Sequence, residues 1–323
     1  MRDHNYRWKV LLAVAFAVCF PVISIGLLPT PLVSVILQGV IYSILALGVG
    51  FLVMQCGMTS FGHACWFGLG AYICAVGPTA TGIRDEVFII GAPIVVGIIA
   101  MLVGLIITRL PGFAFSMVTL AIGQAMFEAA MRTRWLINGG DGFVYRLPSE
   151  IFSLNSRLFH SPQYMLAICW SVLLLILVLL IQLRASRFGL VTEAIRENEE
   201  RARFLGFETL LPRAAVYAIT AMIAAVAGVL FVLYSGFISP ELLHWSVSGS
   251  ALIMALIGGT GALWGPVLGA ITFFLARDSL VGSTEHWMLV MGLALIAVTV
   301  LWPSGMAGAI KYLAARVGEK WGR

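Results

Sequence analysis

Long apolar stretches separated by short polar ones dominate this chain. Each stretch approaches or exceeds the roughly 20 apolar residues that a helix needs to cross a bilayer, apart from two shorter ones near the C-terminal end. The pattern predicts an all-α integral membrane protein, a polytopic bundle of about 8–10 transmembrane or half-membrane helices. The helices are expected at 9–28, 32–54, 61–80, 88–108, 113–131, 164–183, 214–235, 246–258, 265–276 and 286–303.

Charged residues avoid most of these stretches. An Arg or Asp at the bilayer centre costs about 2.5–3.5 kcal/mol on insertion scales, so uncharged runs of this length suit lipid as the solvent. Charged residues make up only 11% of the chain, whereas soluble domains carry about 25%, and the mean hydropathy is +0.99. We therefore expect one membrane domain over 1–323. No Asp, Glu, Lys or Arg occurs in 10–83, 87–108, 158–183, 214–240, 245–276 or 286–310.

The distribution of Lys and Arg predicts the orientation. With the N-terminus inside, fourteen of the twenty Lys and Arg residues lie on the cytoplasmic side, which follows the positive-inside rule. Both termini are then cytoplasmic, the loop at about 184–213 is cytoplasmic, and the loop at about 132–163 is external. The run from 10 to 28 is long for a signal peptide and lacks a small-residue cleavage site, so it is expected to be a retained helix.

A glycine-rich break is expected between the helices at 246–258 and 265–276. Gly258, Gly259, Thr260 and Gly261 are followed by Gly265-Pro266, which can end one helix and start another. Two short helices or a re-entrant hairpin fit the predicted topology, and a tight turn between ordinary helices explains the same residues. Non-helical backbone at depth must be shielded by protein or line a water-filled cavity, so these four residues are pathway candidates.

The cytoplasmic loop at 184–213 is the most strongly charged segment. A single amphipathic helix is predicted over 190–205, with Leu190, Ala194 or Ile195, Ala202 and Leu205 near one stripe. Glu197–Arg201 and Glu199–Arg203 are i,i+4 pairs in the favourable order, and Gly206 is a C-terminal stop. The helix is either a solvated loop element or a docking site for a cytoplasmic partner.

Five segments, taken in chain order, carry a family resemblance. They resemble branched-chain amino acid ABC transporter permeases of the LivM type over most of the chain. The segments are 60–72 (SFGHACWFGLGAY), 113–124 (FAFSMVTLAIGQ), 138–143 (NGGDGF), 189–207 (GLVTEAIRENEERARFLGF) and 236–270 (GFISPELLHWSVSGSALIMALIGGTGALWGPVLGA).

This resemblance implies a multi-subunit machine. An external solute-binding protein delivers the solute, a second homologous permease completes the pore, and cytoplasmic ATP-binding subunits grip the loop helix. The broader importer pattern places Gly six residues after the start of the Glu-Ala pair, whereas this chain has Glu199 there. The residues that match the family's ATPase-coupling segment are Glu193, Ala194, Arg196, Glu197, Asn198, Arg201 and Gly206.

Two further sets of residues are candidates for function. Ser60, His63 and Gly68 are assigned to one small-and-polar helix, as pathway residues or as ordinary helix packing. Gly139, Gly140 and Asp141, in the external loop, could dock the binding protein, although turn geometry explains them equally well.

Several kinds of chemistry lack support in the sequence. The chain has no G-x-x-x-x-G-K-[ST] phosphate loop, so ATP must be hydrolysed by another subunit and no cofactor is expected on this one. The cysteines form no CxxC pair, so no metal site is expected. We find no nucleophile–base set, which predicts that the chain is not an enzyme, and no basic patch that would suit nucleic acid.

The leading expectation is therefore the permease subunit of an ABC importer for branched-chain or other hydrophobic amino acids, in the lipid of a bacterial inner membrane. Urea, short amides or small carboxylates are alternative solutes. A stand-alone secondary transporter or channel is a second class, because broken helices occur there too. Membrane-embedded acidic and basic residues are scarce here, which disfavours a proton-coupled carrier.

Overall fold

The computed structural model describes residues 28–148, 150–152, 154–283, 286–301 and 304–310. The helix predicted at 9–28 lies almost entirely outside the described residues. The other nine predicted apolar helices are present, with boundaries shifted by a few residues. They are α2 (Thr30–Cys56), α3 (His63–Thr81), α4 (Asp85–Ile107), α5 (Gly112–Arg132), α8 (Pro162–Ala185), α11 (Leu210–Ser235), α12 (Trp245–Gly258), α13 (Gly265–Val281) and α14 (Trp287–Leu301).

Short elements connect these helices. The loop after α5 contains α6 (Arg134–Ile137), η1 (Gly139–Asp141), β1 (Phe143–Val144), β2 (Glu150–Ile151), β3 (Leu154–Asn155) and α7 (Arg157–His160). The loop after α8 contains α9 (Arg187–Glu197) and α10 (Glu199–Phe204), and β4 (Phe237–Ile238) and η2 (Pro240–Leu243) follow α11. The fold is thus mostly helical rather than purely α, because β1 pairs antiparallel with β4, and β2 with β3.

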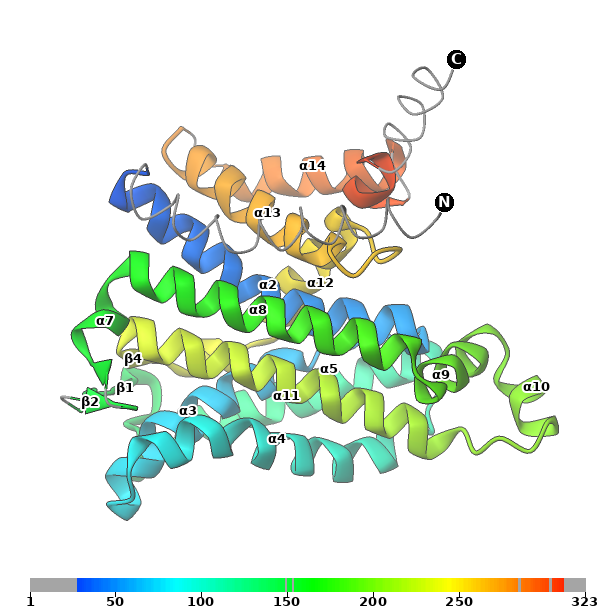
Figure 1. The fold of residues 1–323 in the computed structure, drawn as a ribbon, viewed down its shortest axis with the longest axis horizontal. Helices are drawn as coiled ribbons and strands as arrows, with labels where there is room; N and C mark the ends of the chain where they lie inside the picture. The colour runs from blue at the N-terminus through cyan, green and yellow to red at the C-terminus, as the bar shows by residue number, and fades with distance from the viewer. Residues whose placement is uncertain (1–27, 149, 153, 284–285, 302–303, 311–323) are drawn as a thin grey trace, which may run out of the picture.

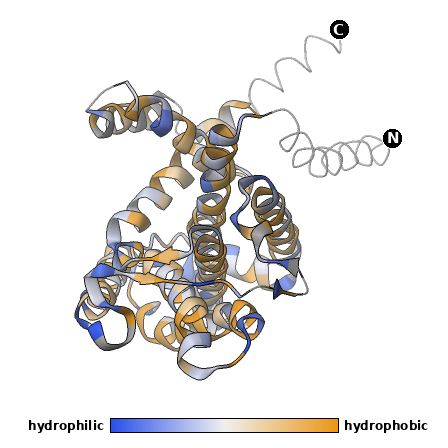
Figure 2. Cartoon of the chain, turned by 90° about the vertical axis from the view of Figure 1, so that its left-hand side faces the viewer, coloured by the Kyte–Doolittle hydropathy of each residue, from blue (hydrophilic) through white to orange (hydrophobic). Residues whose placement is uncertain are grey.

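Two helices form the centre of the bundle. Among the described residues five helices, α2, α4, α5, α8 and α11, are long and apolar enough to cross a membrane. Of these, α2 and α11 are the most enclosed by protein, and they pack against each other antiparallel in the middle of Figure 1. Figure 2 shows apolar helices with polar residues gathered mainly in the connecting segments. This pattern suits a bundle whose solvent is lipid.

The bundle contains two halves of opposite sense that the sequence does not reveal. The helices α2–α5 and α11–α14 occupy equivalent places: α11 packs against α3 and α4, while α2 packs against α12 and α13. We refer to the end of the bundle that holds α9 and α10 as the α9 end, and to the opposite end as the β1 end (Figure 1). From the interior of the bundle, α3 runs toward the β1 end and α12 toward the α9 end.

The starts of α3 and α12 meet inside the bundle. The Ala64 amide of α3 donates a hydrogen bond of 2.6 Å to the Ser248 hydroxyl of α12. His63 contacts Thr220, about 15 Å along α11 from its first residue. Both helices are therefore interrupted elements that begin within the apolar part of the protein.

The predicted break at 258–266 is confirmed as two short helices. Gly259 has a φ of +92°, and a Cβ there would lie 2.3 Å from the Ser304 carbonyl oxygen, so only glycine fits. A Cβ on Gly258 would lie 1.9 Å from the Gly265 carbonyl oxygen. The sequence predicts the second of these helices over 265–276, whereas α13 continues to Val281 and includes Arg277.

A compact cap covers the β1 end. The β1–β4 ribbon joins the loop after α5 to the end of α11, and the Tyr145 amide donates to the Gly236 carbonyl over 2.8 Å. The Tyr145 hydroxyl donates to the Asp85 carboxylate at the start of α4. Burial and this hydrogen bond raise the pKa of the Tyr145 phenol, so it remains a donor. The cap fixes the loop that contains η1.

Candidate functional site

The loop between α8 and α11 folds into two helices rather than the single predicted one. The Ser186 hydroxyl caps α9 by accepting from the Gly189 amide over 3.3 Å. Asn198 has an extended backbone, with φ −160° and ψ 101°, and its side chain caps α10 by accepting from the Arg201 amide over 2.8 Å. A new helix can start at Asn198 because its side-chain oxygen accepts a hydrogen bond from a first-turn backbone amide that has no partner within the helix.

The break also changes which residues face the protein. The predicted stripe is half wrong: Ile195 and Ala202 are buried, at 4% exposed each, but Leu190 and Leu205 are 62% and 71% exposed. The new helix start at Asn198 resets the helical phase, so residues before and after it no longer share a face. No ion pair joins Glu197 to Arg201 within the described residues, whereas Glu199 and Arg203 do pair, at 2.7 Å.

Helix α9 is fastened to the end of α2. The buried Gln55 amide donates to the Gly189 carbonyl over 2.5 Å and to the Thr192 hydroxyl over 2.7 Å. The Arg196 guanidinium donates to the Met54 carbonyl, one of the carbonyls that the end of a helix leaves without a helical partner. Glu193 lies 3.8 Å from Arg196 and 3.6 Å from Arg184, so it bridges α9 to the end of α8.

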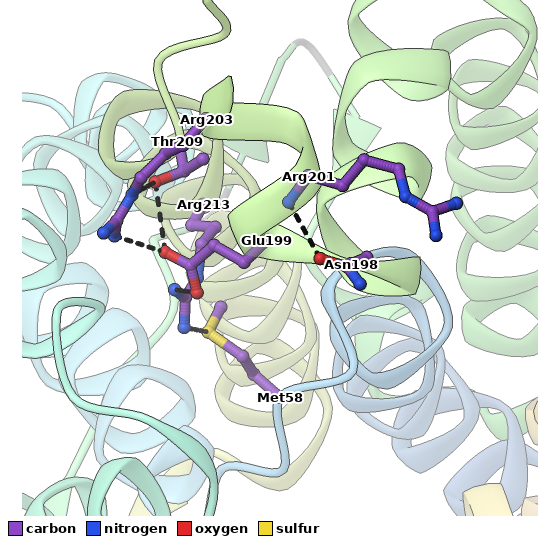
Figure 3. A network of polar contacts seen from close by, with 7 residues as sticks. All are labelled: Met58, Asn198, Glu199, Arg201, Arg203, Thr209 and Arg213. Carbon is purple, nitrogen blue, oxygen red and sulfur yellow. Dashed lines mark hydrogen bonds and ion pairs between the residues drawn. The ribbon is translucent and has the colours of Figure 1, made fainter. Parts of the chain in front are cut away.

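Helix α10 is fastened by a network centred on Glu199 (Figure 3). The Glu199 carboxylate accepts from Arg203 and Arg213, each over 2.7 Å, and from the Thr209 hydroxyl over 3.1 Å. Arg213, near the start of α11, is buried and also contacts the Met58 sulfur at 3.4 Å. Glu199 thus supplies the carboxylate that neutralises the buried Arg213.

We predict that Glu199→Gln destabilises the loop. The substitution keeps the shape but removes the charge that two guanidinium groups share, and hydrogen bonds to charged groups contribute about 1.5–3 kcal/mol. Because solvent reaches Glu199, we expect a loss of about 1–2 kcal/mol, seen as a lower melting temperature of the purified protein. The neighbouring Glu200→Gln is the control, since the Glu200 side chain is exposed; equal melting temperatures for the two variants would contradict the network.

The end of α2, to which α9 is fastened, continues into a short segment that leads to α3 inside the bundle. Gly57 ends α2 in a left-handed conformation, and residues 57–62 continue as non-helical backbone to the start of α3. Two side chains of α5 hold this non-helical stretch. The Ser116 hydroxyl donates to the Thr59 carbonyl over 2.6 Å, and the Phe61 amide donates to the Thr119 hydroxyl over 3.2 Å. These bonds satisfy backbone groups that lipid could not.

An apolar tip stands out from this polar loop. Phe204 is 91% exposed, and Leu205 and Phe207 beside it are also exposed. Exposed aromatic and aliphatic side chains beyond the membrane helices mark contact surfaces for partners. A small cavity of about 100 Å³ opens between α9 and α10 beside this tip, lined in part by Ala194, Asn198 and Arg201. The sequence carries F-L-G-F after a run of charges, but the sequence analysis placed only Leu205 of these residues near the apolar stripe and gave Phe204 and Phe207 no role.

The predicted coupling residues gather around the junction of α9 and α10. A larger groove of about 390 Å³ separates this junction from the end of α2 and the start of α11, and Arg196, Glu197 and Asn198 line it. Gly206 follows α10 with a φ of +87°. Ala194, Glu197, Asn198 and Arg201 are exposed, whereas Glu193 and Arg196 also hold α9 to α2 and α8.

The predicted pathway residues lie in packed surroundings. Ser60 was assigned to a helix but precedes α3, because the backbone there is held by side chains of α5. His63 is fully buried, with its Nε2 atom 3.0 Å from the Thr220 hydroxyl. A Cβ on Gly68 would lie 2.6 Å from a Leu243 methyl group, so η2 packs directly on α3. Gly258 and Gly259 form the α12–α13 break, followed by Thr260 and Gly261; their role in a pathway remains a prediction.

The predicted docking residues form η1 at the β1 end. Gly139 is buried with a φ of +57°, and a Cβ there would lie 2.7 Å from the Met131 carbonyl oxygen. Gly140 and Asp141 are exposed. Within the described ranges no group of three or more His, Cys, Asp or Glu residues could hold a metal ion.

Interrupted apolar helices that meet inside the bundle, with one structured polar loop fastened to them, are consistent with a multi-pass membrane protein. The chain belongs to the family described as the branched-chain amino acid transport system, permease component, which matches residues 32–299. This membership confirms the family resemblance and the expectation that the chain is a transport subunit rather than an enzyme.

Curated relatives agree with the family. The chain is 26% identical to the high-affinity branched-chain amino acid transport system permease protein LivM of Escherichia coli K12, over 82% of this chain and 67% of the relative. It is 34% identical to LivH of the same organism, over 45% and 47%. The autoinducer 2 import system permease LsrC of Yersinia enterocolitica is 28% identical, over 52% and 45%. No solved structure matches the chain.

Proposed function

We propose that this chain is the membrane-spanning permease subunit of an ABC importer that carries branched-chain or other hydrophobic amino acids across a bacterial inner membrane. Family membership supports the class of machine, and the names of the LivM and LivH relatives support the solute. The LsrC relative, which belongs to an import system for another compound, keeps other small solutes as alternatives.

The observation that carries the coupling mechanism is the fastening of α9 and α10. Gln55 and Met54 hold α9 to the end of α2, and the Glu199–Arg213 network holds α10 to the start of α11. Both central helices are therefore gripped at the same end by one polar loop. A force applied to this loop by a cytoplasmic ATPase would act on α2, on α11 and on the segment leading to α3. We assign Glu193, Ala194, Arg196, Glu197, Asn198, Arg201 and Gly206 to this coupling element.

This proposal sets the orientation and the other partners. The α9 end faces the cytoplasm, and the β1 end faces the external solute-binding protein, with Gly140 and Asp141 exposed on η1 as its docking point. A second homologous permease completes the pore, and both termini are cytoplasmic. Residues 1–323 form one permease domain. ATP is used by the partner subunits, while Ser60, His63, Gly68 and the Gly258–Gly261 turn remain pathway candidates.

Purification of the chain from its native membrane tests the proposal. We expect an ATP-binding subunit and a second permease to co-purify in stoichiometric amounts, because the exposed apolar tip of α10 needs a partner surface. A chain that purifies alone and transports amino acids under an ion gradient would instead support the secondary-transporter alternative.

A further inference from the structure

A cavity of about 490 Å³ lies between α2, α12, α13 and α14. Its size falls within the roughly 300–1,000 Å³ typical of small-molecule sites. It combines a cationic side chain, three hydroxyl groups and an apolar wall. The chemically distinctive members of its lining are Arg277, Ser246, Ser250, Tyr42, Phe274 and Met254.

One face of α13 supplies the cation and an aromatic floor. Phe274 and Arg277 lie one helical turn apart, and the Arg277 guanidinium carbon is 5.9 Å from the centre of the Phe274 ring. The Phe274 ring is buried and packs against Tyr42 of α2, with the ring centres 4.9 Å apart. Arg277 is about 18 Å along α13 from Gly265, toward the β1 end. A guanidinium has five N–H donors, so Arg277 can keep its contacts within the protein and still offer a planar pair of donors to a carboxylate beside an apolar surface.

One face of α12 supplies hydroxyl groups and an aliphatic wall. Ser246 and Ser250 are one turn apart, and Met254 continues the same face. The Ser250 hydroxyl donates to the Ser246 carbonyl over 2.9 Å, and the Ser246 hydroxyl lies 2.8 Å from the His244 Nδ1 atom. The Ser250 oxygen keeps lone pairs that can accept from an ammonium group. An arginine, hydroxyl acceptors and an apolar wall are the complement of a small zwitterion with an apolar side chain.

We infer that this cavity is a transient binding site for the transported amino acid, with Arg277 binding its carboxylate and the α12 serines facing its ammonium group. The inference rests on the proposed function and adds the place in the membrane where the solute binds. The solute enters from the β1 end, where Arg277 lies, and its apolar side chain packs against Phe274 and Met254. An anionic lipid headgroup offers the same negative charge to Arg277 and is the competing occupant.

The test uses the complete transporter with its ATPase subunits, second permease and external binding protein, in vesicles of neutral lipid. Arg277→Met should lower ATP-driven leucine uptake at least tenfold while preserving the ATP hydrolysis that the loaded binding protein stimulates. Arg277→Lys, which keeps the charge, should restore part of the uptake. Arg109→Met, an exposed arginine at the end of α4, is the control and should match the wild type.

A second variant tests the cavity without changing charge. Ile253→Trp, which projects bulk into the cavity lining, should also lower uptake at least tenfold with ATP hydrolysis retained. Leu256→Trp, an exposed position on the same helix outside the lining, should transport normally. Normal uptake by both Arg277→Met and Ile253→Trp would overturn the inference.

The other outcomes are also decisive. A parallel loss of uptake and ATP hydrolysis in Arg277→Met would overturn the inference, since Arg277 would then serve assembly. A defect seen only when anionic lipid is added would overturn it too, because a headgroup would be the ligand. Absence of ATP-driven uptake by the wild-type complex would instead refute the proposed function.

Discussion

Replacing Phe204 and Leu205 together by Asp should release the ATPase subunits and abolish uptake while leaving the membrane domain folded. Both side chains are highly exposed in the isolated chain, at 91% and 71%, so the substitution removes little from the interior. An aromatic anchor at a protein interface contributes about 2 kcal/mol or more, and two introduced charges add a desolvation cost. We therefore expect affinity for the ATPase to fall by at least about 30-fold.

Co-purification of the ATPase with the tagged permease measures this loss. The matched control is Val144→Asp, since Val144 is also an exposed apolar residue but lies on β1 at the opposite end. The control should retain the ATPase in full. If the double variant kept a normal amount of ATPase, α10 could not be its docking point, and the assignment of the coupling element would fail.

The second large effect is expected at the crossing of α3 and α11. A Cβ on Gly228 would lie 1.9 Å from the Phe67 carbonyl oxygen, and a Cβ on Gly70 would lie 2.7 Å from the Ala225 α-carbon. Both obstacles are backbone atoms, so no side-chain rotation can make room. Overpacking costs about 1–3 kcal/mol or more, and Gly228→Ala should reach the upper end because the two helices must separate.

The measurement is the melting temperature and membrane yield of Gly228→Ala. Gly91→Ala is the matched control, since Gly91 is also in a helix and a Cβ there meets nothing within 4 Å. The control should behave as the wild type, whereas Gly228→Ala should melt lower and accumulate less. Identical behaviour of the two variants would show that α3 and α11 do not cross as closely as described.

Apolar periodicity predicted most of this fold for a simple reason. A spanning helix must be long and mostly apolar, so the nine apolar helices within the described residues are visible as apolar runs, although α5 also carries Glu128 and Arg132. The break after Gly258 was also predicted, since Gly and Pro together carry a strong local signal. These features depend on residues that are neighbours along the chain.

Features that depend on tertiary contacts could not be predicted in the same way. The non-helical stretch at 57–62 has no Pro, and its backbone is held by Ser116 and Thr119, which are distant in sequence. The two halves of the bundle run in opposite senses, and no repeat in the sequence reveals them. Arg277 follows directly after the helix predicted at 265–276, because nothing local shows that α13 continues past it and lines a cavity.

The coupling loop shows how one residue can change a local prediction. The charged pattern indicated a helix, and its amphipathic character was recognised, but Asn198 divides it in two. Its capping bond to the Arg201 amide is an ordinary local signal that a continuous periodic pattern concealed. The same break exposes Phe204 and Leu205, and so it creates the surface to which the ATPase is proposed to bind.

Energy coupling is the central claim, and solute uptake by reconstituted vesicles tests it most directly. The chain is reconstituted with its co-purified partners and supplied with leucine-loaded binding protein. We predict leucine uptake that requires ATP on the α9 side of the membrane and is absent from vesicles that contain this chain alone. Leucine accumulation by the lone chain under an ion gradient, without ATP, would contradict the account.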